Sequence, residues 1–403
     1  MFDFPATPTT GQQITMPDGT VRVWDGTKWV AGAYGQSAFV PLSGGTMTGP
    51  LVLSGNPAVA LGAATKQYAD TYANNAGRNL IHNALFNVAQ RGAGPWSTAS
   101  SYTVDRWLMA FSGGTYQITQ QPMSDAFRAQ IGDESARNYL STNFTGGSAA
   151  GDFTQITQPI EDVRRLAGKT VVVSFWAIAS TNGLKCGVGL YQNFGTGGSP
   201  SSGVFVPAVS VTLSTSWVRY NVTLNVPSIA GKTLGTAAND YTMLVLWGSS
   251  GATNNANAGG IGVQTGGISL YGVQLEIGSV ATPLDYGGTP QQQLAACQRF
   301  FERFDWPNGG NIALSTTATS PPNAYFAIVP FKVTKRAAPT MTSSAASTFN
   351  AAGLAASSIS LASDIYALKL DLGLSSGGGS NWDAFYVGAN SSPGAWIAAS
   401  ADL

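Results

Sequence analysis

The sequence has little charge. Only 10% of its 403 residues are Asp, Glu, Lys or Arg, with 20 basic against 20 acidic side chains and a formal net charge of zero. A typical globular domain carries about 25% charged residues, and a nucleic-acid-binding surface needs clustered basic ones. The nearest approaches to a basic cluster, residues 164–165 and 332–336, are too short to form such a surface. The composition therefore predicts no nucleic-acid partner.

Cysteine and histidine are also scarce. The chain has two cysteines, Cys186 and Cys297, and one histidine, His82. Two distant cysteines exclude a disulfide framework, and we interpret both as buried thiols. With one histidine, a metal centre or a catalytic triad has too few members, so His82 is predicted to be a packed or surface residue. We expect no cofactor and no metal.

Catalytic motifs are missing as well. The sequence has no nucleophile elbow, no zinc motif, no phosphate-binding loop and no solenoid repeat. A pair of carboxylates for glycoside hydrolysis stays open among 20 acidic residues. We predict that the chain is not an enzyme, and polysaccharide depolymerase is the least favoured alternative.

No apolar run is long enough to cross a membrane, and the first residues have neither the basic start nor the apolar core of a signal peptide. We expect no membrane insertion, and we expect the chain to be synthesised in the cytosol. What the chain does contain is 49 glycines and many uncharged polar residues. This composition is typical of an all-β protein that recognises neutral ligands by hydrogen bonding.

Residues 1–35 are predicted to form a small β-meander. Two Asp-Gly-Thr turns, residues 18–20 and 25–27, separate short runs of Val and Trp, and Asp-Gly supplies the positive φ angles of tight hairpins. Trp24 and Trp29 are interpreted as the core of this meander, with sugar stacking as the alternative. So small a domain is expected to dock on another protein.

Residues 36–78 divide into an extended, Gly-rich half and an Ala-rich half. The Ala-rich half is predicted to be helical, with an apolar stripe at Leu61, Ala64, Tyr68 and Tyr72. A short isolated helix is marginal in water, so this stripe favours contact with other copies of the chain in a short coiled coil.

Residues 79–290 are predicted to form a β jelly roll, because short alternating runs are separated by Gly-rich turns. In residues 217–226 we expect Val218, Tyr220, Val222, Leu224 and Val226 to face the core. Asp105 and Arg106 are interpreted as a buried pair beside a packed Trp107. The predicted strands are residues 115–120, 137–142, 153–158, 170–179, 217–226, 241–247 and 267–277.

Residues 291–403 are predicted to form a C-terminal β-sandwich tip, entered by a helix or strand at residues 291–304. The predicted strands are residues 312–316, 324–333, 357–361, 365–372 and 395–401. We expect the aromatic residues of the tip loops to form a glycan site, with the alternative that they pack the core of an oligomer. The candidate glycan-binding residues are Trp382, Asp383, Tyr386, Trp306 and Tyr325.

Three motifs in residues 41–70 give a specific resemblance. Residues 43–51, SGGTMTGPL, are followed by a Gly-x-Pro step at residues 55–57 and by AATKQY at residues 63–68. This segment resembles the repeat of bacteriophage tail-fibre proteins. Residues 79–92 with 102–109 resemble the start of a jelly roll common in phage fibres, and residues 271–286 resemble the last strand of carbohydrate-binding jelly rolls.

The resemblance implies a homotrimeric tail fibre of the virion, made in the host cytoplasm. It implies a receptor-binding role toward a bacterial surface polysaccharide or lipopolysaccharide, with residues 1–35 attached to a tail or baseplate protein. A purely structural tail or baseplate component is the alternative. The host, the glycan, the kind of particle and the choice between jelly roll and tip as the receptor site stay open.

Overall fold

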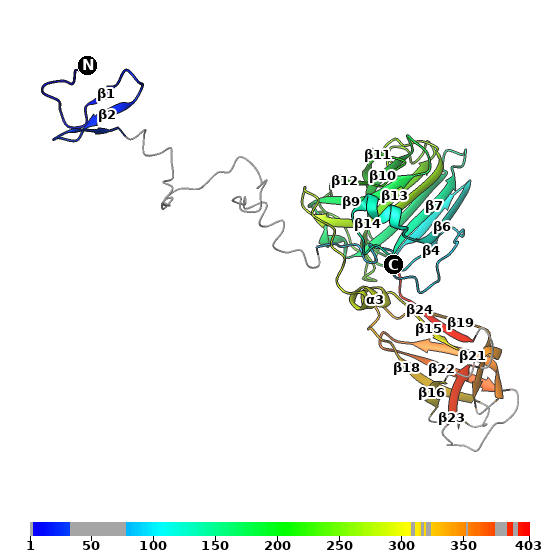
Figure 1. Cartoon of the computed structure of the whole chain (residues 1–403). Helices are drawn as coiled ribbons and strands as arrows, with labels where there is room; N and C mark the ends of the chain where they lie inside the picture. Colours follow the sequence, from blue (N-terminus) through cyan, green and yellow to red (C-terminus); the bar gives the residue numbers. More distant parts are fainter. Residues whose placement is uncertain are drawn as a thin grey trace. The chain divides into compact units, whose positions relative to one another are not determined.

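The computed structural model describes residues 3–32, 78–307, 311–315, 318–319, 324–351, 354–374, 385–389 and 394–403. Its contacts divide the chain into two compact units, Met1–Ala69 and Asp70–Leu403. The predicted stripe at Leu61, Ala64, Tyr68 and Tyr72 lies outside the described residues, so trimerisation stays a prediction. The all-β prediction is confirmed (Figure 1). None of the described helices has the length and hydropathy that a bilayer crossing needs.

The first unit contains the predicted meander. Strands β1 (Gln13–Thr15), β2 (Val21–Trp24) and β3 (Trp29–Ala31) pair antiparallel in that order. Both turns are closed by their aspartates, because Asp18 accepts from the Thr20 amide at 2.9 Å and Asp25 from the Thr27 amide at 2.8 Å. The rings of Trp24 and Trp29 meet edge to face at 5.5 Å, which fits their interpretation as packing residues.

The second unit begins with a sandwich of two antiparallel sheets, which confirms the predicted jelly-roll architecture. A six-stranded sheet has the order β11-β10-β13-β8-β5-β4, and a five-stranded sheet has the order β12-β9-β14-β7-β6. Their strands are β4 (Ser101–Tyr102), β5 (Leu108–Ser112), β6 (Thr115–Pro122), β7 (Asn138–Thr145), β8 (Phe153–Glu161), β9 (Thr170–Ala179), β10 (Lys185–Asn193), β11 (Val204–Thr212), β12 (Val218–Asn225), β13 (Tyr241–Ser250) and β14 (Thr265–Ile277).

The apolar core lies between these two sheets. Val222 and Leu224 on β12, and Val226 directly after it, are buried as predicted, and Tyr220 is half-buried. The prediction was wrong for Val218, which is 39% exposed. It is the first residue of a strand at the edge of its sheet, where fewer neighbours cover a side chain.

A second β-sandwich follows, as predicted. The segment at residues 291–304 provides both a helix, α3 (Pro290–Gln298), and a strand, β15 (Phe301–Trp306). The strands form sheets of order β15-β24-β19 and β16-β23-β20-β21-β22-β18-β17. The remaining bounds are β16 (Asn311–Ser315), β17 (Ala318–Thr319), β18 (Ala324–Pro330), β19 (Thr340–Ser343), β20 (Phe349–Ala351), β21 (Leu354–Ser363), β22 (Ala367–Leu374), β23 (Phe385–Ala389) and β24 (Ala395–Ser400).

Buried charges join the two sandwiches of the second unit. Asp105, Arg106 and Trp107 are all buried, as predicted. The predicted pairing was wrong, because Arg106 pairs with Asp402 at 3.1 Å and Asp105 accepts hydrogen bonds from Gln90. Arg106 also lies over the ring of Phe300, 3.4 Å from its centre. A partner 296 residues away cannot be read from local sequence.

The two cysteines and the histidine are packing residues. Cys186 and Cys297 are buried free thiols, which confirms their interpretation, and burial raises the pKa of both. His82 is half-buried, and its ring centre lies 5.7 Å from that of Phe300. Burial, with a smaller contribution from Arg106 and other arginines, lowers the pKa of His82 to about 4.

Candidate functional site

The outward face of the five-stranded sheet carries a row of side chains that point away from the core between the two sheets. Ser269 on β14 pairs with Ile178 on β9 and with Ser141 on β7. Their chain neighbours Leu270 and Leu140 pair with each other and belong to the core. Because side chains alternate along a strand, Ser141, Ile178 and Ser269 share the opposite, outward face.

A shallow groove of about 330 Å³ follows this face. We call it the sheet groove. Its floor lies across β9, β14 and β7, and Phe127 from the short helix α2 (Asp125–Ile131) also lines it. Its lining residues are Phe127, Tyr139, Ser141, Thr142, Asn143, Ile178, Ala179, Ser180, Gly267 and Ser269.

Two aromatic rings, Phe127 and Tyr139, line the sheet groove as its apolar wall, and the buried ring of Trp217 packs behind them. Phe127, Tyr139 and Trp217 contact one another edge to face, with ring centres 5.6 to 5.8 Å apart. Helix α2 is fixed at both ends, because the Ser124 side chain caps its start and Gly132 adopts the left-handed conformation after its end. The wall is therefore held in place before any ligand arrives.

The polar side chains of the sheet groove are available to a ligand. Ser141, Asn143 and Ser269 donate no side-chain hydrogen bond to, and accept none from, another residue of the described part of the chain. Ser180 is used once, as an acceptor from the Gly267 amide at 2.8 Å. Hydroxyl and amide groups beside an aromatic wall suit a neutral saccharide, since its C–H faces pack on rings and its hydroxyls need both donors and acceptors.

The sheet groove lacks the groups that general acid–base chemistry needs, since no Asp, Glu or His lines it. Among the described residues, no cluster of three His, Cys, Asp or Glu side chains is placed to hold a metal ion. Burial raises the pKa of Tyr139, so its hydroxyl is neutral at physiological pH. The groove offers apolar contact and neutral hydrogen bonding.

The structure describes only some of the predicted tip residues. Trp382 and Asp383 lie outside the described residues. Tyr325 and Tyr386 lie in strands β18 and β23 rather than in loops, and three strands separate these two in the sheet order. Strand spacing puts them roughly 19 Å apart along the sheet. Their role in glycan binding stays a prediction.

Trp306 was also expected in a loop, and this was wrong. It lies in β15, half-buried, with its ring parallel to that of Phe304 at 5.8 Å and packed against the core of the second sandwich. The physical reason is the alternation of β15, which places Phe304 and Trp306 on the same inward face.

Sequence reasoning missed the sheet groove, although part of its signal is visible. Tyr139, Ser141 and Asn143 alternate with Leu140, Thr142 and Phe144, which is the pattern of a strand with one polar face. That β14 lies beside this strand, and β9 beside β14, depends on pairings between segments far apart in the sequence, such as Ser269 with Ser141 and Ser269 with Ile178. Local sequence holds no record of such pairings.

The described fold is similar to several solved structures. A CBM4 structure is 15% identical with a TM-score of 0.28, and the match covers 49% of this chain and 99% of that one. The enzymatically active domain of tailspike protein 4 of bacteriophage CBA120 is 13% identical with a TM-score of 0.27, covering 50% and 21%. The CBM22-1 xylan-binding domain from Paenibacillus barcinonensis Xyn10C is 11% identical with a TM-score of 0.27, covering 51% and 98%.

These identities and TM-scores carry no argument about function. No family model and no curated protein matches the sequence.

Proposed function

We propose that the chain is a homotrimeric receptor-binding protein of a bacteriophage tail fibre, which attaches the virion to a bacterial surface polysaccharide. The fibre assignment is supported by the resemblance of residues 41–70 to the tail-fibre repeat. The saccharide assignment is carried by one observation: the sheet groove combines a preformed aromatic wall with unpaired Ser141, Asn143 and Ser269 side chains.

In this proposal each groove binds weakly. A shallow groove of about 330 Å³ holds only one or two sugar rings and gains a few hydrogen bonds. Three copies on one fibre, and several fibres on one particle, raise the effective concentration of the second and later contacts, so that adhesion becomes strong without a tight site. Catalysis plays no part in this mechanism.

Binding of the full chain to host cells and to a glycan array tests the saccharide proposal. Tyr139→Ala removes part of the aromatic wall and is expected to weaken binding about tenfold or more. Tyr366→Ala is the matched control, because Tyr366 is 64% exposed and lies in the second sandwich away from the sheet groove. Equal binding by wild type and Tyr139→Ala would contradict the groove assignment. Loss of binding in Trp382→Ala instead would move the site to the predicted tip cluster.

The trimer proposal has its own measurement. Light scattering of the full chain is expected to give three times the monomer mass, and replacing Leu61 and Tyr68 with Asp is expected to lower it. A monomeric wild type would contradict the predicted coiled coil. A trimer that binds no susceptible host surface would support the alternative of a purely structural tail or baseplate component.

A further inference from the structure

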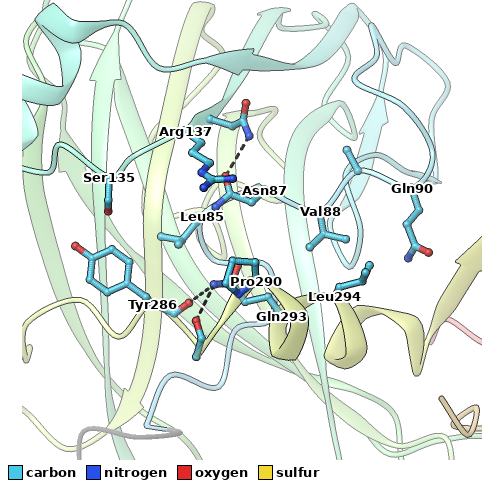
Figure 2. A pocket seen from close by; sticks show the side chains of 13 residues that line it. Leu85, Asn87, Val88, Gln90, Ser135, Arg137, Tyr286, Pro290, Gln293 and Leu294 are labelled. Atoms are coloured by element: carbon cyan, nitrogen blue, oxygen red, sulfur yellow. Dashed lines mark hydrogen bonds between the residues drawn. The ribbon is translucent and has the colours of Figure 1, made fainter. Parts of the chain in front are cut away.

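A second hollow lies in the second unit, away from the sheet groove. Its volume is about 620 Å³ (Figure 2). We call it the Tyr286 pocket. Three segments build it: residues 85–90, residues 135–138 at the start of β7, and residues 286–294 leading into α3. Its lining residues are Leu85, Asn87, Val88, Gln90, Arg137 and Tyr286, with Asn138, Gln293 and others.

Tyr286 presents a fixed aromatic ring to this pocket. Its hydroxyl donates to Asp133 Oδ2 at 3.0 Å, and the same oxygen accepts from Tyr271 at 2.6 Å. Partial burial favours the protonated form of Asp133, but hydrogen bonds from Ser135 and the two tyrosines outweigh it and lower the Asp133 pKa. The carboxylate therefore stays charged and holds the ring of Tyr286, which is 43% exposed.

Some side-chain amide groups of the pocket are held by hydrogen bonds within the protein, and others have donors that are not used by the described residues. Asn138 Nδ2 donates to Asn87 Oδ1 at 3.1 Å, which leaves the Asn87 amide nitrogen without a partner among the described residues. Gln293 Nε2 donates to the Tyr286 carbonyl at 2.6 Å and the Gly288 carbonyl at 3.2 Å. Figure 2 shows these bonds and the Asn87 side chain beside Arg137.

Arg137 is the charged residue of the lining, and no carboxylate lines the pocket with it. Its side chain is exposed and forms no ion pair with another described residue. A guanidinium group presents paired donors that match the two oxygens of a carboxylate or phosphate. The pocket thus combines a sugar-sized space, a fixed ring and a positive charge.

We propose that the Tyr286 pocket is a second saccharide site, which binds a sugar unit bearing an anionic group. The ring of Tyr286 packs on the C–H face of the sugar, and Arg137 and the Asn87 amide bind its carboxylate or phosphate. A uronic acid and a phosphorylated sugar share this chemistry. The inference stands on the pocket itself and does not depend on the sheet groove or on a fibre.

Calorimetry of the full chain with three probes tests the inference: a glucuronic-acid oligosaccharide, glucose 6-phosphate and the neutral glucose oligosaccharide. At least one anionic probe is expected to bind better than the neutral one. Arg137→Gln is expected to weaken that binding about 10- to 100-fold, and Arg137→Lys to restore part of it. Binding is also expected to weaken as salt is raised from about 0.05 to 0.5 M.

Matched variants separate this site from the other proposals. Arg164→Gln removes another exposed arginine, one that lies near Asp162 and is outside the pocket, and is expected to leave the affinity unchanged. Tyr139→Ala is expected to spare anionic binding, so failure of the sheet groove leaves this inference standing. Binding of only the carboxylate or only the phosphate probe identifies the source of the charge. Equal affinity for all three probes, or an Arg137→Gln variant that binds like wild type, overturns the proposal.

Discussion

Replacing Asp402 with Ala tests the physical joint between the two sandwiches of the second unit. The Asp402 side chain is 4% exposed and accepts from Arg91 at 2.6 Å and from Arg106 at 3.1 Å. The Arg106 side chain is 2% exposed and that of Arg91 is 15% exposed. Asp402→Ala therefore leaves two largely buried guanidinium groups without their main counter-ion.

The expected cost follows from that burial. Removing one partner of a buried ion pair typically lowers stability by about 3 to 5 kcal/mol, because the remaining charge stays desolvated. Arg106 keeps a hydrogen bond to the Pro159 carbonyl at 2.6 Å, and Arg91 keeps Asp105 at 3.9 Å. We therefore expect the lower end, a loss of about 3 kcal/mol in the free energy of unfolding.

Urea denaturation of the full chain measures this loss as a shift of the transition midpoint. Asp305→Ala is the control, since it breaks a pair of similar length, Arg303 to Asp305 at 2.8 Å, whose carboxylate is 63% exposed. Exposed pairs contribute about 0 to 1 kcal/mol. Equal, small losses in both variants would refute the reasoning and would mean that water reaches the arginines. Replacing Arg106 with Met together with Asp402→Leu should recover much of the loss, because no buried charge is then stranded at Arg106.

Three further perturbations have defined outcomes. The low pKa of His82, about 4, means that acidification protonates it in the unfolded state first, so wild type loses at most about 3 kcal/mol between pH 7 and pH 4. Urea unfolding at both pH values should show that His82→Gln loses less unfolding free energy than wild type between pH 7 and pH 4, by up to that amount. Gly114→Ala should lower the unfolding temperature by several degrees, because φ at Gly114 is +65° and an added Cβ would lie 1.9 Å from the Thr145 carbonyl oxygen. Gly260→Ala is the control and should lower the unfolding temperature less, because φ there is +72° but the space around the added Cβ is open. Thr289→Ala removes the capping box of α3 and should cost about 1 kcal/mol in the same unfolding assay, whereas no loss would show that the cap is dispensable.

The sequence predicted strands well where side chains alternate. Strand β9 has the predicted bounds, and β6, β7, β8, β13 and β14 lie within a few residues of theirs. Strands β10 and β11 were not predicted. Strand β10 contains Gly187 and Gly189, and glycine is more typical of loops than of strand interiors. At position 187 the strand needs glycine, because a Cβ there would lie 2.3 Å from the Ala258 carbonyl oxygen. Strand β11 contains Pro207, which is tolerated because β11 lies at the edge of its sheet.

The candidate sites could be predicted only in part, because both are made by distant segments. Alternation marked one polar face of β7, but the sheet groove also needs Ser269 and Ile178 from other strands. The Tyr286 pocket needs Asn87, Arg137 and Gln293, which are far apart in sequence. Of the predicted glycan-binding residues, Trp306 lies in a strand and packs inward. The predicted glycan site around Trp382 and Asp383 lies outside the described residues and stays a prediction.

The surface of the second unit carries even fewer charged side chains than the low charged fraction of the sequence indicates. Asp105, Arg106, Glu276, Glu302 and Lys335 are all buried, so several of the few charges are used inside the second unit. Fewer charged side chains are therefore left on the surface than composition alone indicates. Against this background Arg137, which forms no ion pair among the described residues and lines a pocket without carboxylates, is a distinctive positive charge. If the sheet groove and the Tyr286 pocket both bind saccharides as proposed, together they favour a polymer that carries both neutral and acidic sugars. Such a polymer should bind more tightly than a neutral or an acidic oligosaccharide of equal length, because its neutral sugars would bind in the sheet groove and its acidic sugars in the Tyr286 pocket.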